Sequence, residues 1–491
     1  MNTSKVLIIG AGPCGLMTAV ELTRRGVAVT VVDAEEEGAT GSRAVLLWPY
    51  SLELFDGLGL RAEADKRGLA VQALSYHTAP GTVLRLPLDS HHAPLVLPQQ
   101  DTGELLEEEL RRLGGTVERG LRVTGLVTGP DSVTATARRA DGTEVVLMAD
   151  WLVGADGHHS TVREKLGIVF PGEQVPTSFL IAEGPLEGAF DTDSVNYYLG
   201  RTGVMLIAPL PGGKARISGT LNAGDTVVTP ETAQRMLDER GPGGLRFTEV
   251  TLVSVFTSSE RVANTFRAGR CFLVGDAAHV HTPTGGQGLN LGFADVRNLA
   301  WKLAGVIEGR YAPEILDSYD AERRAAAEQT VAATSRMTRN AVLGPVALVV
   351  RNTLMSLAHR TGVLARQLVP MLAGWQVRYP DALGLAGQKT PKGLPAPGSR
   401  SPAWPLEPDP DPIGRFQLVS MGPADGTMSR RGRELAEEES ALVTHRHRTT
   451  AGSGFVLLRP DGYVAAAGRE TDFVPLVRAL KRILPTPTLE R

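Results

Sequence analysis

The chain has 491 residues, of which 42% are hydrophobic and 21% are charged. These proportions are typical of a globular protein, and the length suggests about three domains. A net charge of −3 gives no general attraction to nucleic acids or anionic membranes, so we expect neither as a partner. Two cysteines, Cys14 and Cys271, are too few for a disulfide scaffold, which favours a cytoplasmic protein. No uninterrupted apolar run approaches the ~18 residues of a membrane-spanning helix.

The first thirty-odd residues carry the most specific motif. Residues 5–9 predict a buried strand, and Gly10-Ala11-Gly12-Pro13-Cys14-Gly15 follows at once. An apolar-periodic stretch then predicts a helix, and residues 27–32 predict a second buried strand that ends at Asp33. Strand, glycine-rich turn, helix, strand and acid together make up the dinucleotide-binding fingerprint.

Each glycine of this motif has its own physical role. Gly10 permits the tight turn, Gly12 lets a pyrophosphate approach the backbone, and Gly15 allows helix and strand to pack closely. The helix N-terminus offers N–H groups and a positive dipole end to phosphates, and Asp33 is expected to accept from a ribose hydroxyl. Alone, the motif leaves open whether the dinucleotide is FAD or NAD(P).

The middle of the chain alternates between short strands and helices. The predicted elements are helices at 51–58 and 102–113, strands at 116–123, 132–138 and 144–148, a separate buried strand at 151–154, and strands at 204–209 and 216–221. The adjacent His158 and His159 have no further ligand at metal-binding spacing, so no metal site is predicted. Tyr197, Tyr198 and Arg216 lie in the β-rich part and are candidates to face a substrate.

A second glycine-rich loop follows another strand that ends in an acid. Residues 271–276 predict this strand, with Asp276 at its end, and residues 285–288 lead into a helix from about residue 291. Because no second fingerprint occurs, we interpret the two loops as gripping one large dinucleotide from both ends. His279 and His281 are possible acid–base residues, although packing or capping is the commoner role of loop histidines.

Long helices and a small α+β tail complete the chain. A segment rich in proline and glycine, residues 387–412, separates the helices from strands at 416–419 and 455–459. We expect four parts: a nucleotide-binding domain of residues 1–73, 98–173 and 265–330; a β-rich substrate domain of 74–97 and 174–264; a helical segment of 331–386; and a C-terminal domain of 400–491.

Three ordered motifs resemble those of a known family. Gly10 to Gly15, Gly154-Ala155-Asp156-Gly157 and Gly275-Asp276-Ala277-Ala278-His279 resemble the signature of the class A flavoprotein aromatic hydroxylases, which share the para-hydroxybenzoate hydroxylase fold. Residues 282–290 are also similar to that family, and the resemblance covers about residues 6–385. The tail, with its Arg459-Pro460-Asp461-Gly462 turn, resembles the thioredoxin-like domain of phenol and polyketide hydroxylases.

The resemblance implies an α/β fold in which a Rossmann-like FAD-binding domain is interleaved with a β-sheet substrate domain, followed by long helices and a thioredoxin-like domain. It implies a set of FAD-binding residues, namely Gly10, Gly12, Pro13, Gly15, Asp33, Arg43, Gln99, Val123, Asp156, Asp276, Gly288, Leu289 and Asn290. It also implies that the carbonyl of Pro283 lies near the reacting edge of the flavin. The tail has no cysteine, which excludes a disulfide-exchange role for it.

The implied activity is that of an FAD-dependent monooxygenase. NADPH or NADH reduces the flavin, O2 adds to give a C4a-hydroperoxide, and its distal oxygen passes to an aromatic ring carbon. We expect a polycyclic, polyketide-type substrate, as in antibiotic biosynthesis, and a monomer or homodimer. Epoxidation, Baeyer–Villiger oxidation and flavin-driven dehydrogenation stay open, as does the remote alternative of a non-catalytic flavin-binding partner protein. Trp48-Pro49-Tyr50 and the acidic residues 35–37 depart from the family pattern, and the latter leave NADPH against NADH undecided.

Overall fold

A mixed sheet forms around β1 (Ser4–Ile9), with buried parallel strands at its centre and antiparallel strands at β9, β10 and β18. The structure, a computed structural model, describes residues 4–38, 44–79, 82–200, 203–221, 228–341, 343, 345–381, 383–385 and 390–485. β1 pairs in parallel with β2 (Val29–Val32) and with β11 (Glu144–Gly154), in the order β18-β19-β11-β1-β2-β8. The other strands of this sheet are β8 (Val117–Glu118), β9 (Arg122–Thr128), β10 (Val133–Arg138), β18 (Arg267–Ala268) and β19 (Cys271–Leu273). Continuous apolar runs mark strands of this kind, which are covered on both faces.

β11 is one continuous strand where the sequence predicted two. Its first half pairs antiparallel with β10, whereas its second half, from Ala149, pairs in parallel with β1. The pattern changes from alternating to continuously apolar because the strand passes from a half-exposed hairpin into the buried sheet. Asp150, at the change of partner, is accommodated by Lys5, whose Nζ lies 2.9 Å from its carboxylate. The prediction of two separate strands was therefore wrong.

A second, mainly antiparallel sheet has the order β20-β17-β12-β15-β14-β13-β5-β6, with β16 beside β12. Its strands are β5 (Ala73–Ala79), β6 (Thr82–Pro87), β12 (Gly172–Glu187), β13 (Ser194–Gly200), β14 (Gly203–Leu210), β15 (Lys214–Thr220), β16 (Arg246–Phe247), β17 (Leu252–Val262) and β20 (His279–Val280). A small sheet of β3 (Leu46–Leu47), β7 (Leu95–Val96) and β4 (Leu69–Ala70) is separate from both.

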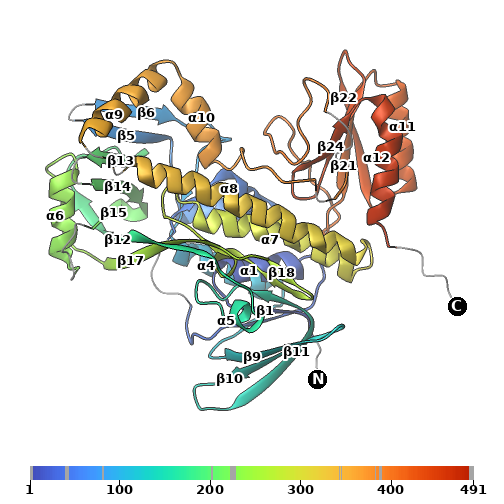
Figure 1. The fold of residues 1–491 in the computed structure, drawn as a ribbon, viewed down its shortest axis with the longest axis horizontal. Coiled ribbons are helices and arrows are strands. Elements are labelled where there is room, and N and C mark those ends of the chain that lie inside the picture. Colours follow the sequence, from blue (N-terminus) through green and yellow to red (C-terminus); the bar gives the residue numbers. More distant parts are fainter. Residues whose placement is uncertain are drawn as a thin grey trace.

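Two long helices, α7 (Gly288–Ile307) and α8 (Asp317–Ala341), cross the middle of the molecule, with the other parts arranged around them (Figure 1). α7 begins three residues before the predicted position and packs against α1. The remaining helices before the tail are α1 (Pro13–Thr23), α2 (Pro49–Gly57), α3 (Arg61–Arg67), α4 (Gln99–Arg112), α5 (Thr161–Lys165), α6 (Pro230–Arg240), α9 (Pro345–Arg360) and α10 (Val363–Leu372). Among the described residues, no helix has the length and apolar character needed to cross a membrane.

The C-terminal domain is a four-stranded sheet with helices, at the upper right of Figure 1. Its elements are β21 (Phe416–Gly422), α11 (Thr427–Glu438), β22 (Val443–Thr449), β23 (Gly454–Leu458), β24 (Val464–Gly468) and α12 (Phe473–Leu480). Phe416 of β21 packs edge-on against Trp301 of α7, with ring centroids 5.7 Å apart. The mixed α/β class is confirmed, while the thioredoxin-like relationship of the tail stays a prediction.

Packing of α1 on α7 leaves no room for a side chain at Gly292, since a Cβ there would lie 2.4 Å from Cys14 Sγ. We expect Gly292→Ala to lower the free energy of unfolding by about 1–3 kcal/mol, because overpacking outweighs the better helix propensity of alanine. Cys14→Ala in the same chain should restore most of the loss. Urea denaturation of both variants measures this.

Gly103 of α4 provides the matched control, because a Cβ there meets no atom within 4 Å. Gly103→Ala should stabilise the protein by roughly 0.5–1 kcal/mol, the helix-interior cost of glycine. Equal effects of the alanine substitutions at 103 and 292 would contradict the tight α1–α7 contact.

Candidate functional site

The turn between β1 and α1 has no space for a side chain at Gly10 or Gly15, but it is open at Gly12. Gly10 has φ +100°, and a Cβ there would lie 2.4 Å from the carbonyl oxygen of Ala155. A Cβ at Gly15 would lie 1.8 Å from the carbonyl oxygen of Gly10, so neither position admits alanine. At Gly12, by contrast, a Cβ would meet no atom within 4 Å, and no side chain caps the helix that starts at Pro13. This open side and free helix end fit a phosphate group.

Asp33 braces this turn from the end of β2. Its Oδ2 accepts from the backbone N–H of Ala11 at 2.5 Å and its Oδ1 accepts from that of Glu35 at 2.8 Å. Each carboxylate oxygen can accept a second hydrogen bond. Asp33 therefore shapes the turn and retains the capacity to accept from a ribose hydroxyl.

The second turn begins at Gly275, which has φ +62° and is followed by Asp276. Asp276 is exposed although Gly275 and Ala277 on either side are buried. The two turns meet at Cys14, because a Cβ at Gly275 would lie 2.9 Å from Cys14 Sγ. The structure thus brings the two predicted loops together, with the acid of the second on an open surface.

Three buried side chains, those of Asp295, His279 and Arg323, support the second turn from behind. Asp295 of α7 accepts from the backbone N–H of Gly275 at 2.9 Å, and His279 Nε2 lies 2.7 Å from the same carboxylate oxygen. Arg323 of α8 donates to its other oxygen at 2.8 Å. His279 and Asp295 are at most 1% exposed, so His279 packs the loop, the commoner of its two predicted roles.

His281 lies in the same loop and is held through its ring. Its Nδ1 lies 2.6 Å from the carbonyl oxygen of Thr282, which makes Nδ1 the protonated nitrogen. Burial lowers the pKa of His281 to about 4, so the ring is neutral at neutral pH. It therefore adds no positive charge beside the start of α7.

Asn290, in the first turn of α7, has hydrogen-bond partners for both its side-chain oxygen and its side-chain nitrogen. Its Oδ1 accepts from Trp48 N at 2.8 Å and from Ser51 Oγ at 2.7 Å, while its Nδ2 donates to the carbonyl oxygens of Leu46 and Gly286, both at 2.8 Å. Trp48 departs from the family pattern, and its indole N–H donates to the carbonyl oxygen of Gly285 at 3.0 Å. These contacts tie the loop to β3 and α2.

The other predicted cofactor residues have varied surroundings. Arg43 lies outside the described residues, but its neighbour Ala44 donates to Gln99 Oε1 at 3.2 Å. Val123 is buried in β9. Asp156 accepts from Ser160 Oγ at 2.5 Å and from the backbone N–H of Val162 at 3.0 Å, which caps α5. Pro13, Gly288 and Leu289 lie half-buried in the first turns of α1 and α7.

A large apolar cavity opens beside the second loop. It measures about 730 Å³ and is bounded by the face of the second sheet, by Pro283 to Gly286 and by α8 and α9. Tyr197 and Arg216 line it, whereas Tyr198 lies on the opposite face of β13 and stacks on His77 at 4.2 Å. Adjacent strand residues point to opposite faces, so only one of the two tyrosines can reach the cavity.

The cavity wall contains stacked aromatic rings and a buried arginine that is paired with a glutamate. Tyr197 stacks on Tyr76 with centroids 4.8 Å apart and planes 10° apart, and burial raises the pKa of both hydroxyls. Arg216 is 2% exposed and donates from Nε to Glu183 at 2.6 Å. Burial lowers the pKa of Arg216, and the Glu183 carboxylate opposes that effect.

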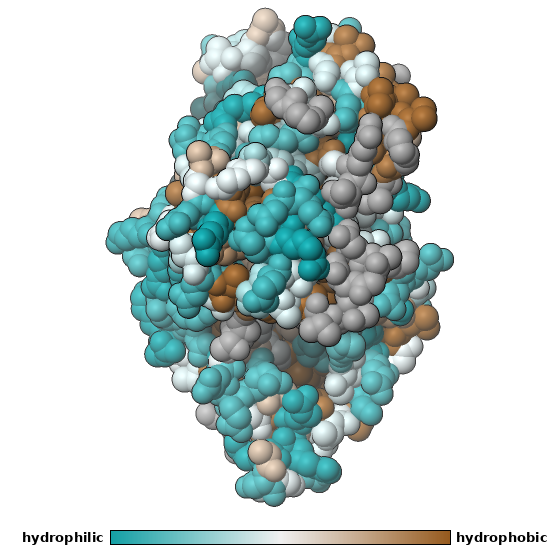
Figure 2. Space-filling view, turned by 90° about the vertical axis from the view of Figure 1, so that its left-hand side faces the viewer, coloured by the Kyte–Doolittle hydropathy of each residue, from teal (hydrophilic) through white to brown (hydrophobic). Residues whose placement is uncertain are grey.

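Residues of α8 and α9 that line the cavity were not predicted. Met337, Thr338, Ala347 and Leu354 belong to this group, and nothing in their spacing distinguishes them from ordinary helix residues. α9 also exposes apolar side chains, with Val346 at 80%. Figure 2 looks at this side of the molecule, where hydrophobic side chains gather near the top.

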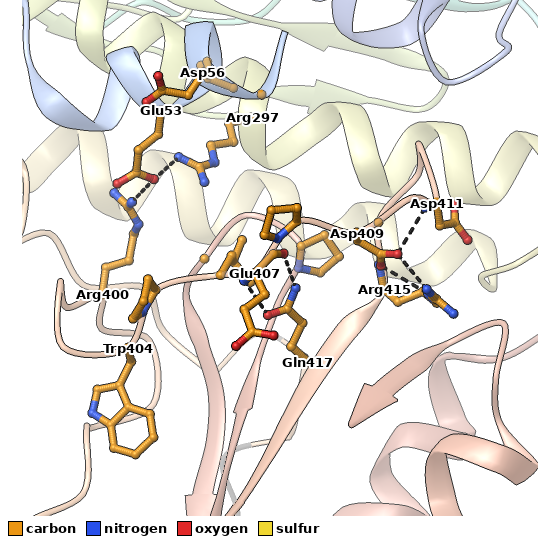
Figure 3. Close-up of a pocket in the computed structure, with 18 of the residues that line it drawn as sticks. Glu53, Asp56, Arg297, Arg400, Trp404, Glu407, Asp409, Asp411, Arg415 and Gln417 are labelled. Atoms are coloured by element: carbon orange, nitrogen blue, oxygen red, sulfur yellow. Dashed lines mark hydrogen bonds and ion pairs between the residues drawn. The ribbon is translucent and has the colours of Figure 1, made fainter. Parts of the chain in front are cut away.

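A second cavity, of about 610 Å³, lies between the C-terminal domain and α1, α2 and α7 and contains none of the predicted site residues. Figure 3 shows its charged lining, in which Arg297 and Arg400 both reach Glu53 and Arg415 pairs with Asp409. Burial alone would raise the pKa of Glu53, but Arg400 and Arg297 lower it. The charged side chains of this cavity are therefore largely paired with one another.

Comparison with known proteins identifies the family of the chain. The model of the FAD binding domain family matches residues 3–334. The chain is 35% identical to 6-methylpretetramide 4-monooxygenase of Streptomyces rimosus, over 99% of this chain and 94% of that protein. It is 33% identical to 12-dehydrotetracycline 5-monooxygenase/anhydrotetracycline 6-monooxygenase of Streptomyces rimosus subsp. rimosus, over 99% of both chains.

Its fold is similar to that of the solved OxyS anhydrotetracycline hydroxylase from Streptomyces rimosus. The TM-score is 0.78 at 29% identity, and the match covers 99% of this chain and 100% of that one. Family, sequence and fold therefore agree with the resemblance carried by the three motifs. The chain belongs to the FAD-binding family of class A flavoprotein aromatic monooxygenases.

Proposed function

We propose that this FAD-dependent monooxygenase hydroxylates a polycyclic, polyketide-type aromatic molecule, with O2 as oxidant and NADPH or NADH as transient reductant. The observation that carries the proposal is the apolar cavity of about 730 Å³ that ends at Pro283 to Gly286. Drug-sized ligands occupy cavities of ~300–1,000 Å³, so a single phenol ring would leave most of this one empty. The relatives named above act on tetracycline-type molecules, which supports the same substrate class.

FAD fits the residues that surround the two turns. In the proposed placement, the open backbone at Gly12 and the start of α1 take the pyrophosphate, Asp33 the adenosine ribose, and Asp276 the ribityl chain. The other predicted cofactor residues complete the site: Gly10, Pro13, Gly15, Arg43, Gln99, Val123, Asp156, Gly288, Leu289 and Asn290. When bound, FAD supplies the activation of oxygen.

The chain's own residues orient the substrate and exclude water. The stacked Tyr76 and Tyr197 rings present an aromatic face to a planar substrate. Arg216, whose Nε and Nη2 both donate to Glu183, places its guanidinium in the wall of the cavity, where in this proposal it contacts a phenol or ketone oxygen of the substrate. The apolar lining keeps water away from the reacting ring, and the backbone carbonyl of Pro283 marks the proposed reacting end.

The test of the proposal is NAD(P)H oxidation by the FAD-loaded protein with a panel of single-ring phenols and polycyclic phenolic ketones. We expect oxidation to be stimulated by the polycyclic compounds and to yield a hydroxylated product carrying ¹⁸O from ¹⁸O2. A ring-expanded ester or lactone would indicate Baeyer–Villiger oxidation instead. A protein that holds FAD but oxidises no NAD(P)H with any compound would support the alternative of a non-catalytic flavin-binding protein.

Gly12→Ala and Gly15→Ala separate FAD binding from folding. Gly12 has an ordinary φ of −67° and space for a Cβ, so its alanine variant should fold with nearly native stability but bind FAD at least tenfold more weakly. Gly15→Ala should lower the melting temperature even without FAD, because its Cβ would overlap the Gly10 carbonyl. Flavin fluorescence quenching and thermal unfolding of the apo-protein measure the two effects. Native FAD affinity in Gly12→Ala would overturn the proposed pyrophosphate position.

Arg216→Met tests the proposed substrate contact. We expect KM for the polycyclic substrate to rise about tenfold, because the loss of one hydrogen bond costs ~1.4 kcal/mol of binding free energy. The affinity for FAD should not change. Arg25→Met is the matched control, because Arg25 is likewise a buried arginine paired with a glutamate, Glu21, and neither residue is among the described cavity-lining residues. It should affect stability but not KM, and equal changes of KM would argue against a direct role of Arg216.

A further inference from the structure

The turn between β23 and β24 of the C-terminal domain, residues 459–463, is inserted against α7 and α8. Arg459 donates from Nη1 and Nη2 to the two carboxylate oxygens of Glu322 on α8, at 2.6 and 2.8 Å. It also donates to Asp461 at 2.6 Å, and the side chains of all three residues are at most 4% exposed. A two-pronged pair of this kind fixes orientation as well as distance.

Lys302 of α7 completes a set of four buried charges. Its Nζ donates to Glu322 at 2.7 Å, and Asn298 Nδ2 donates to both Glu322 and Asp461, at 2.7 and 3.3 Å. Burial alone would raise the pKa of Glu322, but Arg459 and Lys302 bring it down to about 2. Burial lowers the pKa of Lys302 to about 8, so Lys302 is mostly protonated near neutral pH and pairs with the Glu322 carboxylate.

The next residue of α8, Arg323, carries the contact to the second glycine-rich turn. Its Nε donates to Asp295, and Asp295 accepts the backbone N–H of Gly275. Glu322 and Arg323 are consecutive and fully buried, so a shift of α8 that breaks the first contact also displaces the second. The turn that carries Asp276 is therefore held by the same helix segment that binds the C-terminal domain.

A second link runs parallel to the first. Arg323 Nη1 donates to the hydroxyl of Tyr379 at 2.8 Å. The ring of Tyr379 stacks on Tyr463, the last residue of the β23–β24 turn, with centroids 3.8 Å apart and planes 15° apart. The ion pairs of this turn therefore reach the neighbour of Arg323, Glu322, and the Tyr463 ring reaches Arg323 through Tyr379.

We infer that the β23–β24 turn is a positioning element of the FAD site: by holding Glu322 and Arg323, it fixes Asp295 and the Gly275–Asp276 turn. The C-terminal domain thereby raises the affinity for FAD through α8. This inference rests on the proposed placement of FAD beside Asp276. Arg459, Asp461 and Tyr463 are positioning residues, separated from the cofactor turn by α7 and α8.

The test is a double variant, Arg459→Met with Asp461→Asn, in the full chain. It removes one charge of each sign and leaves the Lys302–Glu322 pair intact, which avoids a single uncompensated charge. We expect the dissociation constant for FAD, measured by flavin fluorescence quenching, to rise at least tenfold. The increase in melting temperature that a fixed FAD concentration produces should shrink, because that increase depends on affinity. A merely structural role would lower the melting temperature equally with and without FAD.

The matched control carries the same substitutions at another contact of the C-terminal domain. Arg310 and Asp411 pair at 2.6 Å, and neither contacts Asp295 through a described hydrogen bond. Arg310→Met with Asp411→Asn should change the FAD dissociation constant less than twofold. Equal weakening in both double variants, or native affinity in the Arg459/Asp461 variant, would overturn the inference.

Tyr463→Leu is the second variant, in case the first does not fold. It removes the stacked ring but keeps all four charges, and we expect about threefold weaker FAD binding with a smaller FAD-dependent rise in melting temperature. Unchanged affinity in this variant would count against the inference. A native protein that binds FAD but oxidises no aromatic compound would overturn the proposed reaction and leave this binding test intact.

Discussion

α7 carries polar and charged side chains on a face that water does not reach, and the arrangement of the molecule depends on how they are compensated. Asp295, Asn298 and Lys302 are all 0% exposed. Charges in such surroundings are tolerated only when each has a well-placed partner. α8 supplies Glu322 and Arg323 at consecutive positions, and the C-terminal domain supplies Arg459 and Asp461. An apolar core would tolerate some sliding of these parts, whereas directed ion pairs define one register between α7, α8 and the tail.

The loop from Pro283 to Gly286 lies between a polar region and an apolar region of the molecule. Near the N-terminal ends of α1 and α7, glycine turns and backbone N–H groups form a polar, open cradle suited to phosphates. On the other side of Pro283 to Gly286, the cavity is apolar, and its ionised Arg216 is paired with Glu183. His281 is neutral, so the loop between the two regions relies on oriented N–H groups and helix dipoles rather than on a side-chain charge. In the proposed placement, the phosphates of FAD therefore lie in the polar region, outside the apolar cavity.

Local signals in the sequence were sufficient to predict the two glycine-rich turns and their flanking elements, and insufficient to predict the buried contacts that support them. Strand, turn and helix at residues 5–23 follow from short-range patterns, because glycine spacing and apolar periodicity are local properties. β11 was divided wrongly because its change of partner, from β10 to β1, depends on strands far away in the chain. Tyr198 could not be separated from Tyr197 without knowing which face of β13 meets the cavity. The charges at Asp295 and Lys302 interrupt an apolar stripe and could have indicated a buried network, but their partners Arg323 and Glu322 lie on another helix.

The C-terminal domain illustrates how a domain can contribute to a site without supplying any chemistry to it. It has no cysteine, so thiol exchange is excluded, and its strands approach the rest of the chain at the β23–β24 turn and at Phe416. Removing it would expose Trp301 and leave Glu322 with Lys302 as its remaining cationic partner among the described contacts. Without the domain, water would reach the Lys302–Glu322 pair and weaken the attraction between the two charges. The pair would then hold α8 in one position less strongly. The turn beside Asp276 is bonded to that helix through Asp295, so the proposed FAD site depends on a contact made by residues near the far end of the sequence.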